Sequence, residues 1–247
     1  MQRHRCHVPD ISGDRIVLPE VEAHHVIHVL RLRAGADVTV FDGCGRQWRG
    51  RIHAVSRREV SVDLVETQMP LPEPSIVVTL AVGLLKGDQM SSVIRDATAL
   101  GVCVIAPFVS SHVALPADAW RTRAIERWGR IASSSAAQCG RAVVPVIHDV
   151  VRFEDVLGDA TLGVKVMCVE PGAGELVVLP DGEPSTGTAV VFVGPEGGWS
   201  ADEVAAAAAA GAHSLNLGPR TLRAELAPAV ALAVLWERWD RRVREGP

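Results

Sequence analysis

The spacing of apolar and polar positions changes near residue 70 of this 247-residue chain. Before that point short apolar runs alternate with polar residues, as in "EVSVDLVE" (residues 59–66), which is typical of half-buried strands. Residues 15–19 also predict a strand. Residues 37–43 and 47–55 predict two more, on either side of the turn "GCGR". Short strands joined by such turns favour a small β-barrel or curled sheet.

One stretch of this first part has helical spacing instead. Residues 20–31, "EVEAHHVIHVLR", predict a helix. The residues expected to share its inward stripe are Val21, His25, His28 and Leu32.

Proline at every second position marks the end of this part. Pro70, Pro72 and Pro74 lack the backbone N–H that a central strand needs, so "QMPLPEPS" predicts a semi-rigid spacer. We therefore expect one domain over residues 1–70 and a second over residues 75–247.

After residue 75 the apolar runs become continuous and alternate with helical patterns. Residues 76–85, 102–109, 162–170, 188–194 and 213–218 predict strands covered on both faces. Helices are predicted between them and at the end of the chain, and the helix over residues 86–100 should stop at Gly101. Strands that alternate with helices predict an α/β domain with a mainly parallel sheet, which binds ligands at the carboxyl ends of its strands.

Composition narrows the class of protein. The chain is 48% hydrophobic and 22% charged, which suits a folded domain, and its five cysteines form no C-x-x-C pair. We therefore expect no metal site and no disulfide framework. No signal peptide and no apolar run long enough to span a membrane is evident, so a cytoplasmic location is expected. The net charge is −4, yet arginines cluster within residues 121–141, as on a face that meets phosphate.

A glycine-rich turn, "VGPEGGWSADEV", follows the strand at residues 188–194. It lacks the Lys-Ser/Thr of a nucleotide P-loop, and Ser200 with Glu203 forms a capping box that already satisfies helix amides. Glu196 would repel a phosphate. The turn therefore predicts either a close-fitting pocket for a neutral or cationic ligand, or a plain tight turn.

A second glycine turn, "LNLGPRTLRAELAP", leaves the strand at residues 213–218. Pro228 limits where the following helix can begin, so Arg223, Ala224 and Glu225 should lie at or just before its first turn. The two turns would form one composite pocket if their strands are neighbours.

Together, "VGPEGGWSADEV" and "LNLGPRTLRAELA" resemble the paired signature of the RsmE family. These are SPOUT-class methyltransferases that modify N3 of a uridine in 16S rRNA. The likeness extends along the chain: "EAHHVIHVLRLRAGADVTVFDG" resembles the family's PUA-like N-terminal domain, and "KGDQMSSVIRDATALGV" and "AAQCGRAVVPVI" resemble two central motifs. The resemblance implies a SPOUT-type parallel sheet tied in a trefoil knot, S-adenosyl-L-methionine as cofactor, and a homodimer with a shared active site. Residue patterns alone predict an ordinary unknotted sheet instead.

The resemblance also assigns site residues. The cofactor-binding residues it implies, largely through backbone atoms, are Gly194, Glu196, Gly198, Leu217, Gly218 and Leu222, with Glu170–Pro171 as a third wall. The chain departs from the family pattern at several positions. Ser91–Ser92 stand where the family has an acidic–aromatic pair, and Ala137 stands where it has Glu. Ala224 and Leu226 stand where it has Thr.

The expected chemistry needs positioning and charge stabilisation. Arg223 suits stabilisation of negative charge on the uracil oxygens, and Glu225 suits a base or an orienting role; the alternative for this pair is a salt bridge at a helix start. The 16S rRNA of the small ribosomal subunit is the expected partner. The residues expected to contact RNA are Arg3, Arg5, Arg31, Arg33, Lys86, Gln138 and Arg141. Each of these side chains is equally compatible with an ordinary surface role.

Other functions stay open at this stage. The chain could bind RNA without catalysis, it could handle a nucleotide, or it could methylate a ribose 2′-hydroxyl as related SPOUT enzymes do. His24 and His28, four residues apart, could ligate a metal, but no third ligand stands at an obvious spacing.

Overall fold

The computed structural model describes residues 4–112, 123–170, 176–180, 182 and 184–239. The chain folds as two compact units. The first holds residues 1–73 together with 133–144, and the second holds residues 74–132 and 145–247.

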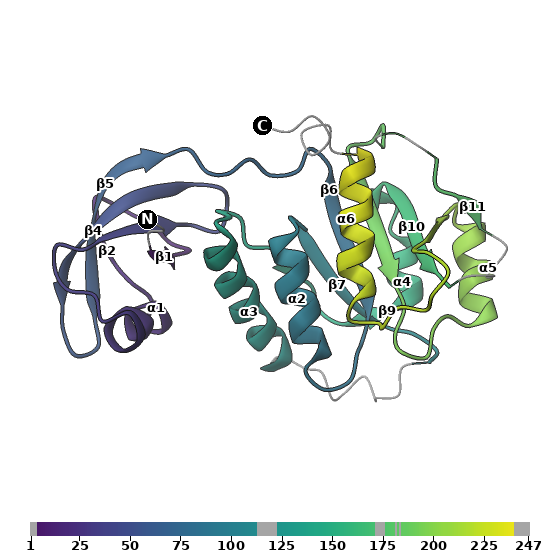
Figure 1. Cartoon of the computed structure of the whole chain (residues 1–247), viewed down its shortest axis with the longest axis horizontal. Coiled ribbons are helices and arrows are strands. Elements are labelled where there is room, and N and C mark those ends of the chain that lie inside the picture. Colours follow the sequence, from purple (N-terminus) through teal and green to yellow (C-terminus); the bar gives the residue numbers. More distant parts are fainter. Residues whose placement is uncertain (1–3, 113–122, 171–175, 181, 183, 240–247) are drawn as a thin grey trace. The chain divides into compact units, whose positions relative to one another are not determined.

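The first unit is a five-stranded sheet with one short helical segment (Figure 1). Its strands run in the order β1-β3-β4-β5-β2, and every pair is antiparallel except β1 with β3. The strand bounds are β1 (His4–His7), β2 (Arg15–Val17), β3 (Asp37–Phe41), β4 (Gln47–Val55) and β5 (Val60–Gln68). The predicted strands of this region are confirmed.

The helical segment of the first unit differs from its predicted stripe. It is an α-helix, α1 (Glu20–His24), that widens into a π-helix over His25–Leu30. Ala23 and Val26 are buried against the sheet, whereas Val21 is 65% exposed. Val21 is already on the exposed face within α1, so the predicted stripe took the wrong face, and the wider π turn from His25 onward departs from 3.6-residue spacing. His25 and His28 are exposed as well.

The second unit contains an all-parallel sheet in the order β11-β13-β10-β12-β6-β7-β8, with β9 paired to β7. The strand bounds are β6 (Val77–Gly83), β7 (Val104–Val109), β8 (Val146–Ile147), β9 (Val151–Arg152), β10 (Val164–Val169), β11 (Val177–Val178), β12 (Thr188–Val193) and β13 (His213–Asn216). The helix bounds are α2 (Gln89–Ala99), α3 (Arg123–Cys139), α4 (Phe153–Gly158), α5 (Ala201–Ala209) and α6 (Ala227–Trp239), with a 3-10 turn at Ala160–Leu162.

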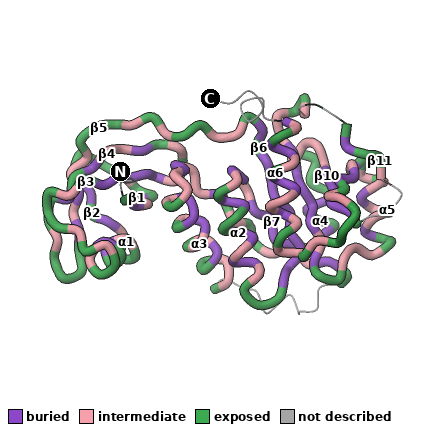
Figure 2. The backbone as a smooth tube through the Cα atoms, in the orientation of Figure 1, coloured by how far each residue is buried: buried purple, intermediate pink, exposed green. Residues whose placement is uncertain are grey.

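Both faces of the central strands of this sheet are buried. Ala81, Ala106, Met167 and Phe192 form one row across four paired strands, and they pack against α4 and α5. Their neighbours along the strands, such as Leu80 and Val191, point to the opposite face and are also buried. Figure 2 shows β6 and β7 as largely buried segments. Helices α2 and α6 contact each other, and Figure 1 shows them side by side in front of the sheet. This confirms the predicted α/β class.

Two predicted helix ends are also confirmed. Gly101 directly follows Leu100, the C-cap of α2, and has a positive φ of 92°, which is the backbone shape that favours glycine after a helix. Helix α6 begins at Ala227 with Pro228 in its first turn, where the missing N–H costs no intrahelical bond. The trefoil knot stays a prediction, because strand order alone does not trace how the chain threads.

Candidate active site

The two glycine turns begin at the same edge of the parallel sheet. Strands β12 and β13 are not direct neighbours, because each of them pairs with β10, which lies between them. The composite pocket therefore has three strand ends rather than two. Glu170, immediately after β10, supplies the third wall that the sequence predicts, while Pro171 lies outside the described residues.

A cavity of about 370 Å³ lies at these strand ends. Its size falls within the range of small-molecule sites. Its lining includes the six residues predicted to bind a cofactor, Gly194, Glu196, Gly198, Leu217, Gly218 and Leu222. Arg223 and Glu225 line it as well. The structure thus brings together residues that stand some thirty positions apart in the chain.

Trp199 fixes the first glycine turn in place. Its indole Nε1 donates a hydrogen bond to the Cys168 carbonyl at the end of β10, at 2.8 Å. Its ring stacks on Phe108, with centroids 5.8 Å apart and planes 13° apart. Gly194 lies against this ring, since a Cβ there would come within 3.1 Å of it. The turn is therefore anchored to the neighbouring strand and to the core.

A second close approach fixes the same turn from the side of β6. A Cβ on Gly83, the last residue of β6, would lie 2.7 Å from the Pro195 nitrogen. Glycine at position 83 therefore lets the turn lie directly on the strand end. Gly198 has a φ of +69°, a backbone conformation that glycine adopts readily, which explains the glycine at this position of the turn.

The predicted capping box of α5 is present. The Ser200 side chain accepts from the Glu203 amide at 3.2 Å, and Glu203 Oε2 accepts from the Ser200 amide at 2.8 Å. Glu203 is buried, and its Oε1 accepts from the Ser111 amide after β7 at 2.9 Å. With these donors satisfied, the start of α5 is poorly suited to bind phosphate.

Glu196 is held by the segment before α2. Its Oε1 accepts from the Lys86 amide at 2.9 Å. In the orientation that satisfies both groups, the Gln89 amide nitrogen donates to the same oxygen at 2.6 Å. Part of this carboxylate's acceptor capacity is thus used within the protein.

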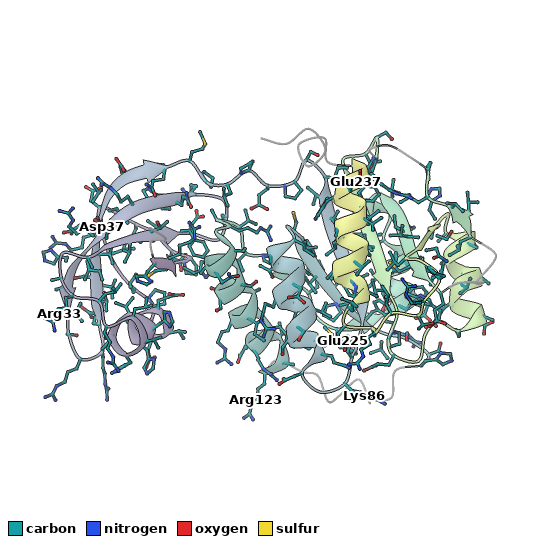
Figure 3. The ribbon with its side chains drawn as sticks, in the orientation of Figure 1. Arg33, Asp37, Lys86, Arg123, Glu225 and Glu237 are labelled. Atoms are coloured by element: carbon teal, nitrogen blue, oxygen red, sulfur yellow. The ribbon has the colours of Figure 1, made fainter. Side chains whose placement is uncertain are left out.

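The second glycine turn presents an ion pair at the cavity. Gly218 has a φ of +109°, and its amide donates to Asn216 Oδ1 at 2.8 Å. Arg223 Nη1 lies 3.8 Å from Glu225 Oε1, with side chains 85% and 23% exposed. Both precede α6, as predicted, and Figure 3 shows Glu225 and Lys86 on the same side of this unit.

The thiol that lines the cavity is poorly suited to act as a nucleophile. Burial raises the pKa of Cys168 to about 12, so this thiol stays protonated at neutral pH. A covalent cysteine adduct is therefore disfavoured at this position.

The described residues that are predicted to contact RNA divide into two groups. The first group is exposed and consists of Arg31, Arg33, Lys86 and Gln138. Among the described residues, Arg31 alone is a non-glycine residue with a positive φ, 53°. Arg3 lies outside the described residues.

Arg5 and Arg141 are instead committed to contacts inside the first unit. The Arg141 guanidinium is 6% exposed and paired with Glu73 at 2.6 Å. Arg5 donates to Gln47 Oε1 at 2.9 Å and to the Arg141 carbonyl at 2.8 Å. These two side chains have structural partners, so they are less available to contact RNA than the exposed residues of the first group.

The two histidines considered as metal ligands lie close together, but no third ligand joins them among the described residues. The His24 and His28 rings lie 4.6 Å apart, and within the described ranges they join no group of three side chains suited to a metal. Across the same ranges no helix is long and apolar enough to cross a bilayer.

Sequence reasoning missed Gln89, Trp199 and Arg220 as cavity residues. Arg220 and Trp199 stand inside the two quoted glycine motifs, so their position was a usable signal. Gln89 comes from a helix more than a hundred residues earlier in the chain, and no local pattern could place it.

The fold and the cavity together define a class of protein. Residues 72–236 match the family described as an RNA methyltransferase domain, and residues 18–65 match an RNA methyltransferase PUA domain. Because the first match covers more than half of the chain, the protein belongs to this RNA methyltransferase family.

The relatives narrow that class. The chain is 32% identical over 226 residues to ribosomal RNA small subunit methyltransferase E of Synechocystis sp., covering 88% of this chain and 71% of that protein. It is 30% identical to the enzyme of the same name from Bacillus subtilis, covering 87% and 86%.

Solved structures of methyltransferases have the same fold as this chain. The enzyme of that name from Neisseria gonorrhoeae, bound to S-adenosyl methionine, aligns with a TM-score of 0.86 at 28% identity, covering 97% of this chain and 99% of that chain. A putative methyltransferase from Legionella pneumophila, in complex with the same cofactor, aligns with a TM-score of 0.85 at 26% identity, covering the same shares.

Proposed function

We propose that the protein transfers a methyl group from S-adenosyl-L-methionine to N3 of a uridine in the 16S rRNA of the small ribosomal subunit. The observation that carries this proposal is the cavity enclosed by the two glycine turns. The six residues that the family resemblance assigns to cofactor binding, together with Glu170, line it. The relatives named above are small-subunit rRNA methyltransferases.

The residues of the cavity fit this cofactor. The volume of about 370 Å³ suits a nucleoside with a short side chain. The lining includes three glycines and the apolar side chains of Leu217 and Leu222, which suit contact with a flat base. The charged side chains that line it are three carboxylates, Glu170, Glu196 and Glu225, against two guanidinium groups, Arg220 and Arg223. The excess of negative charge suits a ligand with a sulfonium and opposes a polyphosphate.

The chain's own groups then have separate tasks. When bound, the cofactor supplies a methyl group on a positively charged sulfur that leaves as a neutral thioether. Uridine N3 attacks well only after losing its proton, and the resulting negative charge spreads onto O2 and O4. The Arg223 guanidinium stabilises that charge, while Glu225 orients Arg223 or accepts the N3 proton. The anchored first turn would hold the donor in a fixed position for attack by N3.

RNA contacts are assigned to the exposed groups of the predicted set. Arg31 and Arg33 in the first unit and Lys86 in the second are exposed, and no ion pair engages their side chains among the described residues. Such side chains can neutralise phosphates at low cost. Gln138 is exposed and can hydrogen-bond a base or a sugar.

The proposal includes a homodimer in the cytoplasm. An apolar groove on the face of α6 supports the dimer. Its lining consists of Leu100, Ala229, Val230, Ala233, Val234 and Glu237. A second copy that packed there would remove these aliphatic side chains from water.

The direct test is to locate the methyl group. Small-subunit rRNA from a strain lacking this gene would be treated with the protein and the cofactor, and the modified nucleoside identified by mass spectrometry. We expect 3-methyluridine at a single site. A methyl group on a ribose 2′-oxygen, or none on either naked rRNA or the assembled subunit, would contradict the proposal.

A further inference from the structure

We propose that Arg220 and Glu170 recognise the amino-acid end of the methyl donor, with Arg220 binding its carboxylate and Glu170 its ammonium group. This inference rests on the proposed function and names two specificity residues for it. Neither residue was assigned a role by its pattern in the sequence beyond Glu170 as a wall of the pocket.

Five charged side chains line the cavity. Three of the five are already engaged. Glu196 accepts from the Lys86 amide and from Gln89. Arg223 and Glu225 pair with each other at 3.8 Å. These three side chains therefore already have partners within the protein before a ligand binds.

The other two have no such partner. Within the part of the chain that the structure describes, neither Glu170 nor Arg220 makes a side-chain hydrogen bond or ion pair, although both line the cavity and both are exposed. They are the acidic and the basic group that a ligand can engage without breaking an existing contact.

Glu170 and Arg220 are placed so that both can contact one ligand. Glu170 directly follows β10, and Arg220 lies in the turn that follows β13. These strands are hydrogen-bonded neighbours, with Val169 registered opposite Asn216 at the carboxyl ends. Glu170 and Arg220 therefore leave adjacent strand ends on the same edge of the sheet. The left-handed backbone of Gly218 turns the second segment over the cavity.

The chemistry of the two groups matches the amino-acid end of the donor. That end carries one carboxylate and one ammonium group. Guanidinium binds carboxylate through paired N–H donors, and a carboxylate accepts readily from an ammonium. A phosphate would instead meet Glu170, Glu196 and Glu225 around the same space, which disfavours RNA backbone inside the cavity. The remaining lining is mostly apolar, with Val169, Val193, Leu217 and Leu222 among its residues, and is left for the adenosine.

Ligands that lack one part of the donor separate these roles. Calorimetry would measure the dissociation constants of S-adenosylmethionine, decarboxylated S-adenosylmethionine and 5′-methylthioadenosine for the full-length protein and its variants. Arg220→Ala should weaken S-adenosylmethionine about tenfold or more, and leave the two ligands without a carboxylate unchanged. Glu170→Gln should weaken both ligands that carry the ammonium group and leave 5′-methylthioadenosine unchanged.

Arg58→Ala serves as the matched control, because Arg58 is an exposed arginine in a turn of the first unit. It should leave all three affinities unchanged. Equal losses for all three ligands in Arg220→Ala would indicate a structural role and overturn the inference. Unchanged affinity for S-adenosylmethionine in that variant would also overturn it. Failure of the wild-type protein to bind any of the three would instead contradict the proposed function itself.

Discussion

Arg223 combines high exposure with a place at the cavity wall, so its removal should affect chemistry rather than folding. Arg223→Ala should change the free energy of unfolding by less than about 0.5 kcal/mol and leave the affinity for S-adenosylmethionine nearly unchanged. Turnover should fall about a hundredfold or more, because charge on the uracil oxygens loses its stabiliser. Single-turnover methylation of rRNA would measure this, and Arg223→Lys should recover only part of the rate. Full activity of Arg223→Ala would remove Arg223 from the mechanism.

Trp199 has the opposite character, because it holds the cofactor turn in shape. Trp199→Phe keeps the stack on Phe108 but loses the bond to the Cys168 carbonyl, and should cost about 1 kcal/mol of stability. Trp199→Ala loses both, and should cost about 3 kcal/mol. Cofactor affinity should fall in the same order, as measured by calorimetry beside urea unfolding. Trp48→Phe, in the first unit, should leave that affinity unchanged. Wild-type affinity in Trp199→Ala would show that the anchor does not shape the site.

At this scale, glycines were readable from the sequence and buried arginines were not. Gly198 and Gly218 have positive φ values that few other residues adopt, so glycine at these positions predicts a turn. Arg141 pairs with Glu73, 68 positions away, and Arg5 reaches the Arg141 carbonyl, 136 positions away. A partner at that separation leaves no local signal, so both arginines look like surface residues in the sequence.

At the scale of elements, the turn between β3 and β4 shows how one buried carboxylate fixes a hairpin. Asp42 is buried and accepts from the Cys44 amide at 2.8 Å and from the Arg46 amide and side chain at 3.0 and 2.6 Å. Burial raises the pKa of Asp42, but these hydrogen bonds outweigh it, and the pKa lies below its usual value.

This turn makes stability depend on pH in a defined direction. A depressed folded-state pKa contributes stability that is present above the unfolded value of about 3.9 and is lost as pH falls through the folded value. Asp42→Asn should therefore lower the free energy of unfolding by about 1–2 kcal/mol at pH 7, and the difference from wild type should shrink below about pH 4. Urea unfolding between pH 7 and pH 3 would measure it. Asp63→Asn, at a surface pair, should have a smaller effect, and a constant difference across this pH range would contradict the account.

The hydrophobic pattern predicted which segments form strands and helices, but it did not predict which face of the helical segment at residues 20–30 is buried. Strands over residues 37–68 and the parallel strands of the second unit match alternation and continuous apolar runs, because burial on one or two faces dictates those patterns. The π-helix at His25–Leu30 breaks the rule, since an inserted residue shifts every later side chain around the axis.

At the scale of the whole molecule, the division into units is not a single cut in the sequence. Residues 133–144, which include the end of α3, belong with the first unit. The sequence did not predict this assignment, because the bridge that joins Gly43 to Val143 links residues far apart in the chain and leaves no local pattern.

The proposed dimer makes a prediction at this scale. Val234→Asp places a charge in the apolar groove on α6, so it should dissociate a dimer of 26.3-kDa chains into monomers. Light scattering after size exclusion would measure the mass. Val65→Asp, at an exposed position of the first unit, should leave the mass unchanged. A wild-type protein that is monomeric at all accessible concentrations would contradict this part of the proposal.

The central claim is that the turns at residues 194–199 and 217–225 enclose one methyl donor, and a crystal structure of the protein with S-adenosylmethionine tests it most directly. The account predicts the donor between those turns, with its adenosine against backbone atoms and its sulfonium beside the carboxylates of the cavity. A donor bound at another place, or a cavity that stays empty at saturating concentration, would contradict it.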